Sequence, residues 1–127
     1  TDPSAYYPHF LGYGDETGVG AGEGANLNLP LAFGSGDADF LGAVETLARR
    51  AVEFGAEALV VSAGWDAHQA DPLSKLAVTS AAYPRVGEIL ARMKLPTVIV
   101  QEGGYSLTAV SEAAPAFVSA FMDASGG

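Results

Sequence analysis

The pattern of apolar and polar positions divides the chain into helices and strands. Apolar residues spaced three and four apart predict three helices, which cover approximately residues 39–54, 79–93 and 107–122. Alternating or continuous apolar runs predict three strands, which cover residues 25–31, 58–62 and 97–101. Pro115 lies inside the last helix, where a proline predicts a kink or a break.

The order strand, helix, strand, helix, strand, helix is typical of an α/β domain. The second and third strands are continuously apolar, which is expected when helices cover both faces of a sheet. Right-handed crossovers would make these two strands parallel. Ligands bind outside the carboxyl ends of the strands in such sheets, so the loops 64–78 and 102–105 become the candidate site.

The composition limits which binding partners and which cellular location we expect for the chain. The 127 residues suit one domain, and the net charge is -9 from 15 acidic and 6 basic residues. A chain so poor in Lys and Arg is not expected to bind nucleic acid, and no apolar run is long enough to cross a membrane. The chain has no cysteine, which excludes disulfides and thiolate chemistry and fits a cytoplasmic location.

The stretch SAGWDAHQADP places polar groups directly after a buried strand. Asp66 lies too far ahead of the next helix to cap it, so it is a candidate metal ligand or general base. His68 forms a D-x-H pair with Asp66, but on an irregular loop the two side chains need not converge. Asp71 precedes Pro72, and this pair favours a structural Asx turn.

The stretch QEGGY follows the next buried strand. Two glycines before Tyr105 allow a sharp turn, and the tyrosine is either a core side chain over the sheet or a hydrogen-bond donor facing the crevice. Glu102 is a candidate base, or it fixes the turn through loop amides. The glycine series GVGAGEGAN lacks the preceding strand and following helix of a dinucleotide fingerprint, which argues against a phosphate loop.

Three blocks occur in a characteristic order: DETGVGAGEGANLNLPL, LVVSAGWDAHQADPL and PTVIVQEGGY. Together they resemble the histone deacetylase and acetylpolyamine amidohydrolase superfamily, and the opening DPSAYYPHFLGYGDETG is similar to its class II-like bacterial branch. The resemblance implies an arginase-like α/β fold, a parallel sheet with helices on both faces. It also implies a zinc-dependent deacetylase, a hydrolase that removes acetyl groups from acetylpolyamines or acetyl-lysine.

The resemblance also implies roles for single residues. Asp66 matches the family's third zinc ligand, and Tyr105 matches the tyrosine that polarises the scissile carbonyl. Leu73 matches a residue at the rim of the substrate tunnel and lacks the glutamate of the eukaryotic polyamine-selective branch. Leu73 and Gly104 are therefore assigned to substrate binding, whereas His68 falls at a position that is not a ligand in the family.

The family's other two zinc ligands and its paired histidines have no counterpart here, because the chain's histidines are His9 and His68. Residues 1–127 therefore resemble the C-terminal part of a single catalytic domain whose N-terminal half is absent. We expect the isolated chain to be inactive, because zinc sites use three or four protein ligands. Unpaired strand edges would favour a homo-oligomer. The alternative is a non-catalytic α/β module that assembles with a partner chain.

Overall fold

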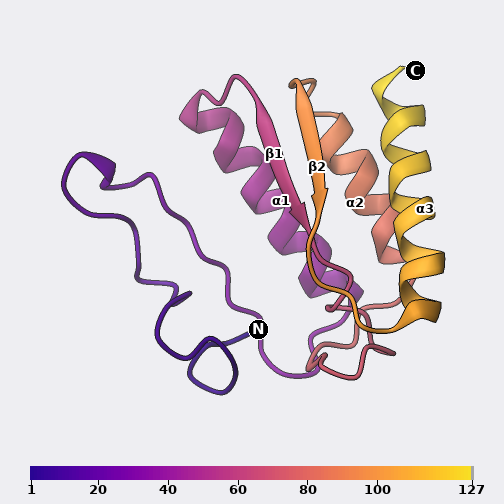
Figure 1. Ribbon diagram of the computed structural model, residues 1–127. Helices are drawn as coiled ribbons and strands as arrows, with labels where there is room; N and C mark the ends of the chain where they lie inside the picture. The colour runs from indigo at the N-terminus through magenta and orange to yellow at the C-terminus, as the bar shows by residue number, and fades with distance from the viewer. Residues whose placement is uncertain (127) are drawn as a thin grey trace.

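A computed structural model describes residues 1–126 (Figure 1). After an irregular N-terminal segment, the elements follow in the order η1 (Gly20–Gly22), α1 (Asp37–Phe54), β1 (Leu59–Ala63), α2 (Ala82–Ala91), β2 (Thr97–Gln101) and α3 (Leu107–Ser125). The three helices and the second and third strands predicted from periodicity are confirmed, with ends shifted by up to three residues. None of the helices in the described chain combines the length and the apolar character that crossing a membrane requires.

The strand predicted over residues 25–31 is wrong. The amide groups of Asn26 and Asn28 donate to the backbone carbonyls of Glu16 and Tyr13, at 2.5 and 2.9 Å. The polar positions of this segment therefore bind a neighbouring loop, although their alternation imitates the solvent face of a strand. Pro30 also has no N–H to offer a sheet.

α3 runs through Pro115 as one helix, so the chain does not break there. A proline inside a helix deprives the carbonyl four residues earlier of its donor. That carbonyl belongs to Ser111, and both Ser111 and Pro115 are exposed. Water therefore has access to the group that loses its partner, which makes an uninterrupted helix tolerable.

β1 and β2 form a parallel pair in register from Leu59 opposite Thr97 to Ala63 opposite Gln101. Parallel pairing was the prediction, and it is confirmed. Figure 1 shows α1 and α2 behind the strands with α3 beside α2, so these helices cover one face of the sheet. The second face, which the family resemblance predicts to be covered as well, is open to solvent.

Burial along the strands follows this arrangement. Val61 and Ile99 pack against the core, whereas Val60, Val98 and Val100 on the other face are 70%, 60% and 43% exposed. We call these three valines the open sheet face. Exposed valines in adjacent strands form an apolar patch of the kind that marks an interaction surface.

The core lies between the covered face and the helices. The ring of Trp65 packs 5.6 Å from the rings of both Tyr83 and Phe117, measured between centroids. α2 approaches α3 closely at Gly87, where an added Cβ would lie 3.0 Å from the backbone nitrogen of Phe121 and closer still to the carbonyl of Phe117. Glycine at this position therefore permits the contact between the two helices.

Candidate active site

The two candidate loops leave the sheet side by side. Beyond the last paired residues, the N–H of Glu102 donates to the carbonyl of Ala63 at 2.9 Å, and the N–H of Trp65 donates to the carbonyl of Gly103 at 3.1 Å. These bonds continue the ladder of parallel strands past its end. As a result, the stretches GWD and EGGY face one another at the carboxyl edge of the sheet, where the sequence placed the site.

The carboxylate of Asp66 lies between two glycines. A Cβ at Gly64 would lie 2.6 Å from its Oδ1, and a Cβ at Gly103 would lie 2.7 Å from its Cγ. Only residues without a side chain leave room for the carboxylate in this position. Asp66 is exposed, and in the part of the chain that the structure describes no group donates a hydrogen bond or pairs ionically with its carboxylate. Its oxygens are therefore available to a ligand.

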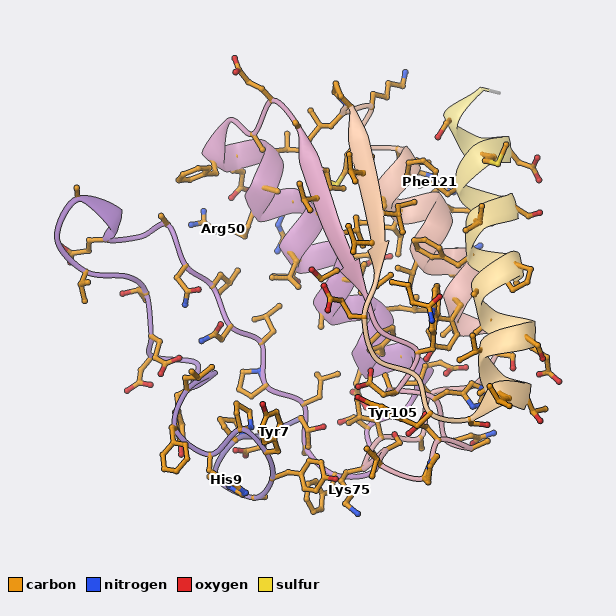
Figure 2. All side chains as sticks on the ribbon, in the orientation of Figure 1. Tyr7, His9, Arg50, Lys75, Tyr105 and Phe121 are labelled. Carbon is orange, nitrogen blue, oxygen red and sulfur yellow. The ribbon has the colours of Figure 1, made fainter. Side chains whose placement is uncertain are left out.

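Tyr105 is 59% exposed, so it is not a core side chain over the sheet. Gly104 precedes it with φ 133°, a conformation that L side chains rarely adopt. A Cβ on Gly104 would also lie 2.9 Å from Trp65 Cδ1. Gly104 therefore turns the chain sharply against Trp65 and releases the tyrosine side chain toward solvent. Figure 2 shows Tyr105 near the end of the molecule where the strands finish.

Asp66 and Tyr105 line the same hollow, which has a volume of about 1110 Å³. Leu73 and Gly103 also line it, and the N-terminal segment contributes Tyr7 to its wall. Leu73 is 50% exposed. The structure thus brings Asp66, Leu73 and Tyr105 together, whereas Gly104 is not among the residues that line the hollow. A hollow of this size accommodates a small organic molecule.

A buried tyrosine supports the loop from below. Tyr83 is 2% exposed, and its hydroxyl donates to the carbonyl of Trp65 at 3.4 Å. Burial raises the pKa of its phenol, and the nearby carboxylates of Asp66, Asp71 and Asp37 raise that pKa further. Tyr83 therefore stays neutral and remains a donor to the backbone just before Asp66.

His68 is buried and is oriented away from a ligand role. Its Nδ1 accepts from the N–H of Ala70 at 3.1 Å, so Nε2 carries the proton and donates to Ser80 Oγ at 3.0 Å. The hydroxyl of Ser80 in turn donates to Glu112 at 2.9 Å. Both ring nitrogens are thus engaged in the fold. Within residues 1–126, no group of three or more His, Cys, Asp or Glu side chains could hold a metal ion.

Asp71 forms the predicted Asx turn and also a contact that the sequence analysis missed. Its Oδ1 accepts from the N–H of Leu73 at 2.9 Å, which is the turn. Its Oδ2 accepts from the N–H groups of Tyr105 and Ser106 at 2.7 and 3.1 Å. Burial acts to raise the pKa of this carboxyl, but hydrogen bonds from the three N–H donors hold it below its usual value. No local signal could have revealed this contact, because Tyr105 lies 34 positions along the chain.

Comparison with known proteins identifies the family. Residues 1–121 match the profile described as histone deacetylase domain. Acetylpolyamine amidohydrolase 1 of Pseudomonas aeruginosa is 46% identical over 109 residues, a match that covers 86% of this chain and 32% of the relative. Acetylpolyamine amidohydrolase of Burkholderia pseudomallei is 42% identical over 120 residues, covering 94% of this chain and 35% of the relative.

A solved structure supports the same assignment. The crystal structure of acetylpolyamine aminohydrolase from Burkholderia pseudomallei superposes with a TM-score of 0.93 at 41% sequence identity, covering 97% of this chain and 36% of that one. The chain therefore belongs to the histone deacetylase family of hydrolases and has the α/β fold of its members. It spans about a third of the length of the relatives it matches.

Proposed function

We propose that this chain supplies one zinc ligand and the oxyanion donor of an amidohydrolase that removes acetyl groups from acetylated amines. One observation carries the proposal: the carboxylate of Asp66 and the phenol of Tyr105 line a single hollow at the carboxyl edge of the sheet. The relatives named acetylpolyamine amidohydrolase support the reaction class.

Asp66 fits the role of a zinc ligand. Zinc sites in proteins accept carboxylate oxygens, and the carboxylate of Asp66, which packs against two glycines and has no hydrogen-bond donor among residues 1–126, is available to bind a cation. When bound, zinc polarises the substrate carbonyl and lowers the pKa of water. This chain offers one such ligand, so the others would come from polypeptide outside residues 1–127, and we expect the isolated chain to be inactive.

Tyr105 would donate a hydrogen bond from its hydroxyl to the oxygen that gains negative charge as the amide carbonyl is attacked. Removing one such donor typically costs about 2.7–4 kcal/mol of transition-state stabilisation. Its side chain starts from a fixed backbone and projects into the hollow. Leu73 would form the apolar rim that the alkyl chain of the acetylated amine passes, and Gly104 would serve substrate binding indirectly, by setting the direction of Tyr105.

The substrate would be a small acetylated amine or acetyl-lysine. Glu102 lies in the wall of the hollow, and the net charge of -9 favours approach of a cationic substrate by electrostatic steering. The same charge disfavours nucleic acid. A cytoplasmic enzyme that works without a membrane partner agrees with this composition.

The proposal is tested in a chimera, in which residues 1–127 replace the matching segment of the Burkholderia pseudomallei relative. We expect the chimera to deacetylate acetylspermidine or an acetyl-lysine peptide, whereas the chain alone with added zinc does not. Tyr105→Phe should lower kcat by about 10²–10³-fold with zinc retained. Asp66→Asn should lose zinc and activity together.

Matched controls distinguish these effects from general damage. Tyr13→Phe removes a phenol whose hydroxyl donates to the carbonyl of His9, outside the wall of the hollow. Asp123→Asn removes an exposed carboxylate from α3. Both controls should keep full activity. If Asp66→Asn keeps the zinc content and activity of Asp123→Asn, or Tyr105→Phe keeps the kcat of Tyr13→Phe, the proposed role of that residue is refuted.

A second candidate is a non-catalytic module that assembles with a partner chain. The open sheet face favours it, as does an apolar cavity of about 410 Å³ between α1, β1 and α2. Co-expressing this chain with the remaining two thirds of the Burkholderia relative tests both candidates. A stable complex without deacetylation would favour the module, and a complex with deacetylation would favour the hydrolase. Self-association of the chain alone, measured by sedimentation, would show a homo-oligomer.

A further inference from the structure

A single buried carboxylate connects the two loops of the site. Asp71 is 5% exposed and lies on the loop after β1, whereas two of its three hydrogen-bond donors, Tyr105 and Ser106, lie after β2. An Asx turn needs one carboxylate oxygen, and Oδ1 performs that task with Leu73. The second oxygen is therefore not needed for the local turn and is devoted entirely to the other loop.

The charge of Asp71 is compensated by backbone groups. In the described part of the chain it forms no ion pair, and its partners are three N–H groups. Ser106 is the N-cap of α3, so the carboxylate also faces the positive end of a 19-residue helix. Hydrogen bonds to an ionised acceptor are about twice as strong as those between neutral groups. Ionised Asp71 is thus suited to hold the start of α3 and Tyr105 in place.

The backbone around Tyr105 needs a restraint of this kind. Gly104, immediately before Tyr105, adopts φ 133°, and glycine allows this backbone many other conformations. Before Gly104 in the chain, the carbonyl of Gly103 is already fixed by a hydrogen bond from the N–H of Trp65. After Gly104, the hydrogen bond from Tyr105 N–H to Asp71 fixes the backbone of Tyr105. The starting point of the tyrosine side chain is therefore determined by Asp71.

We propose that Asp71 is a positioning residue, whose carboxylate sets the spacing between the rim residue Leu73 and the hydroxyl of Tyr105 across the hollow. This inference rests on the proposed function. One carboxylate group binds the backbone of both residues, so the two cannot separate without breaking one of its bonds. Asp71 touches no reacting atom and acts through Tyr105.

The test uses two substitutions of Asp71. Asp71→Asn keeps the shape of the side chain and replaces one acceptor oxygen by a donor. Asp71→Ser keeps a hydroxyl acceptor for the turn with Leu73 but is too short to reach the N–H groups of Tyr105 and Ser106. Asp71→Ser thus preserves the turn, so the proposal remains testable if Asp71→Asn fails to fold.

The first readout is hydrogen exchange in the 127-residue chain. We expect the amides of Tyr105 and Ser106 to exchange at least tenfold faster in both variants. The amide of Ala109, which is bound to Ser106 Oγ at 3.3 Å, is the internal reference for the start of α3 and should change less. Unchanged exchange at Tyr105 would overturn the proposal, because the hydrogen bond would then not restrain the loop.

The second readout is kinetic and uses the chimera. Both variants should lower kcat about tenfold, change KM less than twofold and leave the zinc content unaltered. In a Tyr105→Phe background, the further loss from either Asp71 variant should vanish, because the hydroxyl that Asp71 positions is gone. If instead the losses in kcat from the Asp71 variant and from Tyr105→Phe multiply, the positioning role is refuted but the proposed function is not. Full activity of Tyr105→Phe would refute the proposed function and this role together.

Discussion

Replacing Gly103 by alanine tests whether the position of the Asp66 carboxylate matters. The added Cβ would lie 2.7 Å from the carboxylate carbon, whereas carbon atoms in favourable contact are about 3.5–4.0 Å apart. The carboxylate must therefore retreat by about 0.8 Å or more. Gly103 does not have a positive φ, so alanine brings no backbone strain. Gly64 also lies close to this carboxylate, because a Cβ there would lie 2.6 Å from Asp66 Oδ1.

Metal ligands tolerate little displacement. Credible metal–ligand distances fall within about 0.2 Å of their usual values, and a misplacement of about 1 Å can cost 10²-fold in rate. We expect Gly103→Ala to weaken zinc binding by the chimera at least tenfold and to lower its kcat about 10²-fold. The fold should change little, because Asp66 is exposed and its carboxylate accepts no hydrogen bond from the residues that the structure describes.

The assay measures zinc content against buffered free zinc, and then turnover at saturating zinc. Gly42→Ala is the control, since its Cβ meets no atom within 4 Å and it lies inside α1. Alanine there should stabilise the chain by up to about 1 kcal/mol through helix propensity. If Gly103→Ala binds zinc and turns over substrate as well as Gly42→Ala does, the carboxylate is not held as described or does not bind the metal.

Three further predictions concern stability and association. Gly87→Ala should lower the free energy of unfolding in urea, because overpacking against the Phe117 carbonyl costs about 1–3 kcal/mol. This cost exceeds the gain of about 1 kcal/mol in helix propensity. A more stable variant would contradict the close approach of α2 and α3. Asp71 has a lowered pKa, so its ionised form stabilises the fold above about pH 4, and this contribution disappears as pH falls through the folded-state pKa. Asp71→Asn should therefore reduce the acid-side slope of unfolding free energy against pH, and an unchanged slope would argue against the hydrogen bonds of Asp71. Val60→Thr combined with Val98→Thr should reduce self-association in sedimentation while keeping strand propensity; association as strong as before would exclude the open sheet face as the contact.

Elements defined by local periodicity were predictable. α1, β1 and β2 follow from apolar spacing alone, and their parallel pairing follows from the handedness of the crossover. The common edge that brings Asp66 and Tyr105 together was also predictable, because the carboxyl ends of neighbouring parallel strands meet there. The chemical roles of these two residues came from the family resemblance and stay predictions.

Features that depend on distant contacts could not be predicted. The alternation around Asn26 and Asn28 reflects side-chain bonds to another loop, which periodicity cannot distinguish from a strand. Whether Tyr105 faced the core or the crevice was decided by the turn at Gly104 against Trp65. The second task of Asp71 had no local signature, since a buried carboxylate and a distant N–H leave no joint pattern in the sequence.

The two-stranded sheet has a consequence for how the molecule opens. Among residues 1–126 each strand is paired along one edge, and small sheets without further strands contribute little cooperative stability. α2 and α3 approach one another closely at Gly87 and Phe117, and we expect this pair of helices to be the last unit to unfold. Asp66 lies on the loop that leaves β1, so its position depends on the weaker of these two units and would be better fixed where further strands pair with the sheet.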